Sequence, residues 1–125
     1  MATQHIVKSY DQEITLLSRK ILEMGGLVEH QIAKAVDALV KRDVEQAAEV
    51  VEADDQIDRM EEEIDQHAIR LLATRQPMAI DLRLITMAMK IANDLERMAD
   101  HATNIAEKVH YMIHGQRINR LPPEA

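Results

Sequence analysis

The chain has 125 residues, a formal net charge of −7, three Gly, three Pro, and no Cys, Phe or Trp. This length predicts one domain, and a core limited to aliphatic side chains and Met favours packed helices over many short strands. The acidic balance argues against nucleic acid as a partner, because phosphate binding needs clustered Lys and Arg. We find neither a signal-peptide core nor an apolar run that would span a membrane, and therefore expect a cytoplasmic protein without membrane insertion.

The first predicted helix covers residues 5–41. Its apolar residues recur three and four positions apart, the spacing of a buried helix face. They are Ile14, Leu17, Ile21, Met24, Val28, Ile32, Ala35 and Leu39. Gly25 and Gly26 interrupt this pattern, and we interpret them as a kink or as a place where another helix approaches closely.

The second predicted helix covers residues 44–73. Asp43 is the expected N-cap, and Gln46 three positions later completes the pattern of a capping box. The predicted buried face is Ala47, Val50, Asp54, Ile57, Glu61, Ile64, Ala68 and Leu71. Two of these positions are acidic, which is unfavourable unless a partner compensates the charge.

The third predicted helix covers residues 78–114, after Pro77 and before a C-terminal cap at Gly115. Its first apolar series is Ile85, Ala88, Ala92, Leu95, Ala99, Ala102, Ala106, Val109 and Ile113. A second series has a spacing of seven, and we assign it to the core as well. It consists of Leu84, Ile91, Met98, Ile105 and Met112.

These elements predict an all-α fold, an antiparallel up-down-up three-helix bundle over residues 1–115, because short connections make neighbouring helices antiparallel. Residues 116–125, with two adjacent prolines, are predicted to be an irregular C-terminal tail. A bundle this slender leaves its flanks exposed, so we expect self-association.

Acidic side chains form stripes on the second and third helices. Counting residues away from the connection near residue 76 places Glu96 and Asp100 level with Asp54 and Asp58. Four carboxylates at one level are an oxygen-rich site for Fe, Mn, Mg, Ca or Zn. Further ligands or supporting hydrogen bonds are expected from a second set: Glu61, Glu62, Asn93 and Asn104.

Two other interpretations of the acidic residues stay open. Acidic runs on helices are commonly solvated faces that bind no metal. A ferritin-like di-iron protein would need Glu-x-x-His motifs from two helices, and this chain has one, Glu107 to His110, which only a dimer would complete. The sequence shows no nucleophile with a base beside it and no Gly-rich phosphate loop, so we predict neither catalytic residues nor a bound organic cofactor.

Three sequence runs carry a family resemblance. They are Asp54-x-x-Ile57-Asp58, Gln76-Pro77-x-x-x-Asp81-Leu82-Arg83, and Asp94-Leu95-Glu96-Arg97-x-x-Asp100-His101-Ala102-x-Asn104-Ile105-Ala106. Together with Met24-Gly25-Gly26-Leu27 they resemble the PhoU family, regulators of the bacterial phosphate-specific transport system. The resemblance implies a three-helix repeat with a multinuclear metal cluster, with Fe or Zn as the expected metals, on the motifs Asp54/Asp58 and Glu96/Asp100.

The function implied by the resemblance is that of a cytoplasmic negative regulator rather than an enzyme. Such a protein connects the ATPase subunit of the phosphate transporter to the sensor histidine kinase, at the inner face of the membrane. It restrains phosphate uptake and the phosphate-starvation response when phosphate is plentiful. Family members usually carry two three-helix repeats, whereas this chain has one, so we expect a homodimer to restore the two-repeat surface.

Overall fold

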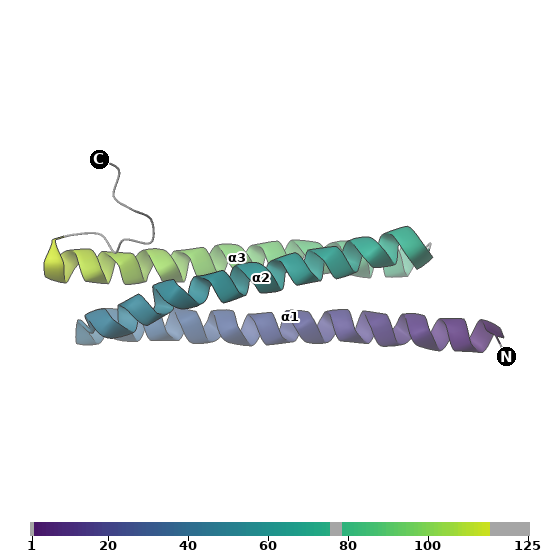
Figure 1. The fold of residues 1–125 in the computed structure, drawn as a ribbon, viewed down its shortest axis with the longest axis horizontal. Coiled ribbons are helices and arrows are strands. Elements are labelled where there is room, and N and C mark those ends of the chain that lie inside the picture. The colour runs from purple at the N-terminus through teal and green to yellow at the C-terminus, as the bar shows by residue number, and fades with distance from the viewer. Residues whose placement is uncertain (1, 76–78, 116–125) are drawn as a thin grey trace.

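The computed structural model describes residues 2–75 and 79–115. They form α1 (Ala2–Lys41), α2 (Val44–Arg75) and α3 (Ala79–His114), and no strand occurs among them. The three helices lie side by side along their length, with α2 antiparallel to α1 and α3 (Figure 1). The prediction of an all-α up-down-up three-helix bundle is therefore confirmed. None of these helices combines the length and the apolar character that crossing a bilayer requires.

Two helix boundaries differ from the predicted ones. The first helix already begins at Ala2 rather than at residue 5, and the second continues to Arg75 rather than ending at residue 73. Neither extension meets a glycine or a proline, and Pro77 disfavours helix only for the residue directly before it. The predicted start of the third helix at residue 78 and the predicted tail 116–125 lie outside the described residues.

The core is a strip of buried side chains contributed by all three helices. Its larger residues lie towards the α2–α3 connection and its small ones towards the α1–α2 turn. The first part is built on Leu17, Met24, Val28, Ile57, Ile64, Leu71 and Ile85. The second part is mostly alanine, with Ala35, Ala38, Ala47, Ala102 and Ala106 beside Val50, Val51 and Val109. Substituting alanine for a fully buried residue such as Ile64 would lower the free energy of unfolding by roughly 2–5 kcal/mol.

The two glycines of α1 do not interrupt the helix, which continues from Ala2 to Lys41. A Cβ atom added to Gly25 would lie 4.0 Å from Leu95 Cδ1, and one added to Gly26 would meet no atom within 4 Å. The added Cβ at Gly25 would make an ordinary van der Waals contact, and the one at Gly26 would lie in open space. The three helices of the described bundle therefore do not require glycine at either position.

The turn between α1 and α2 closes with a Schellman motif. Arg42 adopts φ 55°, its N–H donates to Leu39 O at 3.3 Å, and Asp43 N–H donates to Ala38 O at 2.9 Å. This left-handed position usually holds glycine, because a side chain is strained there. Gly115 has the corresponding role after α3, with φ 68° and its N–H donating to Tyr111 O at 2.7 Å, so the predicted C-terminal cap is confirmed.

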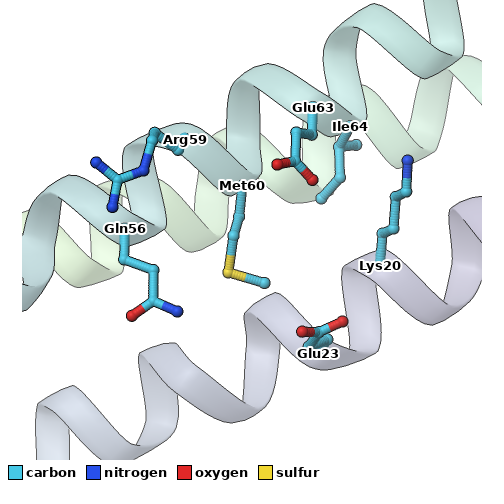
Figure 2. A pocket seen from close by; sticks show the side chains of 7 residues that line it. All are labelled: Lys20, Glu23, Gln56, Arg59, Met60, Glu63 and Ile64. Carbon is cyan, nitrogen blue, oxygen red and sulfur yellow. The ribbon is translucent and has the colours of Figure 1, made fainter.

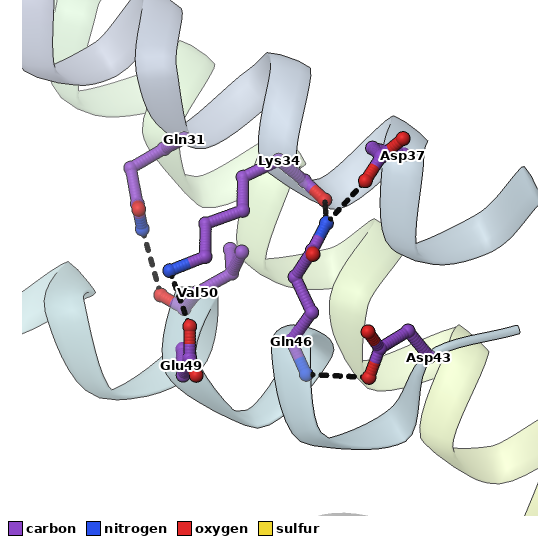
Figure 3. Close-up of polar contacts among 7 residues, drawn as sticks. All are labelled: Gln31, Lys34, Asp37, Asp43, Gln46, Glu49 and Val50. Carbon is purple, nitrogen blue, oxygen red and sulfur yellow. Dashed lines mark hydrogen bonds and ion pairs between the residues drawn. The ribbon is translucent and has the colours of Figure 1, made fainter. Parts of the chain in front are cut away.

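The N-cap of α2 is confirmed, but the capping box is not formed. Gln46 N–H donates to Asp43 Oδ1 at 3.0 Å, as an N-cap requires. The Gln46 side chain turns to α1 instead, where Nε2 donates to Lys34 O at 2.9 Å and to Asp37 Oδ2 at 2.8 Å (Figure 3). The last turns of α1 lie close enough to offer these acceptors, so a contact between helices replaces the local one.

Ionic contacts join the same parts of α1 and α2. Lys34 Nζ lies 2.6 Å from Glu49 Oε2 across the two helices, and Lys41 Nζ lies 3.1 Å from Asp37 Oδ2 one turn away. The hydrogen bond from Gln46, followed by the contact with Lys41, lowers the pKa of the Asp37 carboxyl. Of the two ion pairs, Lys34–Glu49 joins α1 to α2 and Lys41–Asp37 lies within α1. Ion pairs open to solvent contribute little to the stability of the fold.

Most of the second apolar series of α3 is not in the core, contrary to our prediction. Leu84, Ile91, Met98 and Met112 are exposed, whereas Ile105 is half-buried and packs against the alanine-rich part of the core. Each helix of a three-helix bundle has two neighbours, and the alanine-rich series of α3 already occupies the side that faces both of them. Leu39 and Ile113, which we also assigned to buried faces, are likewise exposed.

Candidate metal centre

Three aspartates converge between α2 and α3. One carboxylate oxygen from each of Asp54, Asp58 and Asp100 lies within 4.8 Å of the other two. Asp54 and Asp58 stand one turn apart on α2, and the antiparallel α3 brings Asp100 to the same level. The Asp54 side chain is only 3% exposed, Asp58 is half-buried and Asp100 is exposed, so the cluster opens from the core to the surface.

Glu96 adds a fourth carboxyl group to this cluster. Its pKa is raised from 4.5 to about 8, mainly by removal from water and further by the hydrogen bond and the charge of Asp100 and by the hydrogen bond with Asp58. Two carboxyl groups form a hydrogen bond only when one of them keeps its proton. The four carboxyl groups that we predicted as metal ligands are thus brought together, with a proton or a cation needed to hold them at this separation.

Glu61 and Asn93 lie beside the cluster and contact each other. Asn93 Nδ2 donates to Glu61 Oε2 at 3.3 Å. Burial is the main cause that raises the pKa of Glu61; the bond from Asn93 opposes it, and the nearby charges of Asp65, Asp58 and Asp100 add to it. Burial also raises the pKa of Asp65. Glu61 therefore lies within the electrostatic field of the aspartates, although it is not one of the three that converge.

The remaining candidates lie apart from this group. Glu62 is exposed on α2, and Asn104 is exposed one turn beyond Asp100. His101 is exposed as well. Glu107 and His110, the pair considered for a di-iron site, are half-buried about two turns further along α3. The His110 ring packs against His114 with a centroid distance of 4.8 Å.

Two polar residues next to the cluster escaped the sequence argument. Gln31 is buried in α1, and its Nε2 donates to Val50 O at 2.8 Å (Figure 3). Val50 is one helical turn before Asp54, so this bond links α1 to the turn that presents the buried aspartate. Thr103 is also buried, and its hydroxyl has no hydrogen-bond partner within the described part of the chain. Gln31 was detectable, since it lies three residues after Val28 and four before Ala35 in an apolar series.

A hollow of about 210 Å³ lies elsewhere, between α1 and α2. Figure 2 shows side chains of both charges around it, with Lys20 and Arg59 alternating with Glu23 and Glu63. Mixed charges of this kind concentrate no field for an ion of either sign. The acidic cluster is therefore the candidate site of the described structure.

The donor set of the cluster suits a hard or borderline cation. All four groups offer carboxylate oxygen, the ligand that Mg, Ca, Mn and Fe prefer and that Zn accepts. A cation would replace the proton on Glu96 and would compensate the charge of the buried Asp54. The residues present therefore fit a metal ion held between α2 and α3.

Fold and site together define an all-α bundle protein with a cluster of carboxylates between two of its helices. The family model of the PhoU domain matches residues 21–109, which include every carboxylate of the cluster. The chain belongs to the PhoU family.

Relatives of known name and structure agree with this assignment. The phosphate-specific transport system accessory protein PhoU homolog of Caulobacter vibrioides is 43% identical over 106 residues, covering 85% of this chain and 46% of that protein. Its counterpart in Zymomonas mobilis is 42% identical over 118 residues, covering 94% of this chain and 50% of that protein. The chain thus spans about half the length of these curated relatives.

Two crystal structures share the fold. PhoU from Pseudomonas aeruginosa superposes with a TM-score of 0.82 at 41% sequence identity, over 89% of this chain and 53% of that one. The phosphate transport system regulatory protein PhoU from Streptococcus pneumoniae gives a TM-score of 0.79 at 34% identity, over 88% of this chain and 52% of that one.

Proposed function

We propose that this chain is a non-enzymatic regulator of phosphate transport that binds metal ions at the acidic cluster. Membership of the PhoU family supports the regulatory role, and so do relatives named as accessory proteins of phosphate-specific transport. The observation that carries the metal site is the convergence of Asp54, Asp58 and Asp100. Glu96 lies beside them, with its pKa raised to about 8 by burial and by hydrogen bonds with Asp100 and Asp58.

Asp54, Asp58, Glu96 and Asp100 are the proposed ligands. Asn93 would support the site by orienting Glu61, whose carboxylate lies within the field of the cluster. Fe and Zn are the metals we expect first, with Mn, Mg and Ca as alternatives, and an open row of carboxylates is suited to more than one ion. The bound metal would supply positive charge that joins α2 to α3 and presents a defined surface to a partner.

The proposed cellular role is that of a negative regulator of phosphate uptake and of the phosphate-starvation response. As an adaptor, the chain would contact the ATPase subunit of the phosphate transporter and the phosphate sensor histidine kinase. It would work in the cytoplasm, peripherally at the inner face of the membrane, and as a homodimer.

Elemental analysis of untagged protein tests the metal site. After size-exclusion chromatography in chelator-free buffer, we expect more than one Fe, Zn or Mn per chain. The double variant Glu96→Gln/Asp100→Asn should retain its helicity and lose this metal. Asp94→Asn is the matched control, because Asp94 is an exposed aspartate of the same helix that is not one of the converging residues. Equal metal contents in the double variant and the control would refute the site.

Binding assays test the adaptor role. Metal-loaded wild type should bind the purified ATPase subunit and the cytoplasmic part of the sensor kinase, and the double variant should bind both more weakly. Failure of the loaded protein to bind either would refute the adaptor proposal and leave the metal site intact. The di-iron alternative predicts oxygen consumption by Fe(II)-loaded protein, and rapid consumption would favour an enzyme over a regulator.

A further inference from the structure

The C-terminal end of α3, the yellow end of the helix in Figure 1, carries two histidines on one side. His110 and His114 are four positions apart, the spacing at which side chains of a helix are neighbours. Their ring centres lie 4.8 Å apart, and the ring planes are tilted by 47°. His110 is half-buried and His114 is exposed, so one ring is partly covered by the protein while the other is open to solvent. We call these two residues the histidine pair.

The separation of the two rings is compatible with chelation of one metal ion. A metal–nitrogen bond of about 2.05 Å, with about 1.1 Å from the nitrogen to the ring centre, places each ring centre about 3.2 Å from a shared ion. Ring centres 4.8 Å apart would then subtend an angle of about 100° at that ion. This angle lies between the right angle of a square-planar site and the angle of about 109° of a tetrahedral one.

The surroundings of the histidine pair favour a cation. The last carbonyl groups of a helix give its C-terminal end a partial negative charge. Glu107 lies three positions before His110 on the same side of α3 and is half-buried. Its carboxylate is not among the three ligand groups that converge in the described part of the chain. We therefore assign to Glu107 a supporting negative charge, and to the two imidazoles the bonds to the ion.

We propose that the histidine pair is a second metal site, which binds a late transition-metal ion such as Zn²⁺ or Cu²⁺. Imidazole nitrogen suits Zn, Cu and Ni, whereas Mg and Ca are bound by oxygen ligands. The pair begins ten residues beyond Asp100, about 15 Å along the helix, so it binds its ion separately from the acidic cluster. The two sites differ in the metals that they select, because the carboxylates accept hard cations that the histidine pair does not bind.

Calorimetric titration of Zn²⁺ into chelator-treated protein tests the proposal. The Glu96→Gln/Asp100→Asn background removes two ligands of the acidic cluster, so the two sites are tested separately. His114→Ala should raise the dissociation constant for Zn²⁺ roughly 10-fold or more, since losing even a residue that supports a metal ligand costs that much. His101→Ala is the matched control, because His101 is an exposed histidine of the same helix with no histidine three or four positions from it. It should leave the dissociation constant unchanged.

Electron paramagnetic resonance of the same protein with one equivalent of Cu²⁺ identifies the ligands. The spectrum should show hyperfine splitting from two imidazole nitrogens, and His110→Ala and His114→Ala should each remove it. Circular dichroism verifies that the variants are helical. Two outcomes would overturn the proposal. One is equal Zn²⁺ affinity in His114→Ala and His101→Ala, which would mean that the rings only pack against each other. The other is a copper spectrum without nitrogen splitting.

Discussion

Glu96 should make the stability of the metal-free protein depend on pH. Its pKa is raised from 4.5 to about 8 in the folded chain, while the unfolded chain titrates near the ordinary value. Between these two pH values the folded chain holds a proton that the unfolded chain has lost. The free energy of unfolding contributed by Glu96 is therefore fully present below about pH 4.5 and is lost as the pH rises through about 8.

The size of this contribution follows from the exposure of the site. A difference between 4.5 and about 8 corresponds to roughly 5 kcal/mol for a group that is fully removed from water. Glu96 is only half-buried and Asp100 is exposed, so solvent screens much of the repulsion. We therefore expect a contribution of about 1–2 kcal/mol. Glu96→Gln keeps the shape, carries no charge at any pH, and should remove this contribution.

Urea unfolding of chelator-treated protein at pH 5, 6.5 and 8.5 measures the effect by circular dichroism. The variant should gain about 1–2 kcal/mol over wild type at pH 8.5 and almost nothing at pH 5. The pKa of His67 is lowered by burial and then by the charge of Lys20, so the contribution of His67 to the free energy of unfolding rises with pH. Variant and wild type share this contribution, and it cancels in the difference between them. A difference that stays constant from pH 5 to pH 8.5 would refute a protonated Glu96.

Three further substitutions test the local structure, each by urea unfolding at pH 7. Asp43→Ala removes the acceptor for Gln46 N–H and should lower the free energy of unfolding by about 1 kcal/mol. Arg42→Gly relieves a side chain at φ 55° and should raise it by about 0.5–1 kcal/mol. Gly26→Ala adds a Cβ with no atom within 4 Å and should raise it by about 1 kcal/mol. A change of opposite sign would contradict the contact described at that position.

The fold was predictable because apolar spacing and helix boundaries are local properties of the sequence. The N-cap at Asp43 and the C-terminal cap at Gly115 needed only their immediate neighbours. The level of Asp54 with Asp100 followed from counting along antiparallel helices of known rise. The side chain of Gln46 escaped this reasoning, since its partners Lys34 and Asp37 belong to another helix and become acceptors only after packing.

The wrong assignment of Leu84 and Ile91 to the core has a different cause. Helix α3 carries two apolar series, and spacing alone shows that each lies on one side of the helix without showing which side meets α1 and α2. The series that contains the alanines is the buried one, because small side chains such as Ala92 and Ala99 allow the three helices to approach closely. The bulkier series then remains on the flank, where only another molecule or a further segment of chain would cover it.

The proposed metal site at the acidic cluster and the exposed apolar series of α3 lie on opposite sides of the helix. Successive residues of a helix are rotated by about 100°, so Met98 and Asp100, two positions apart, are separated by about 200° around the axis. A molecule or a further segment of chain that covered the exposed Met98 would therefore leave Asp100 and the carboxylates between α2 and α3 accessible to cations and to a regulatory partner.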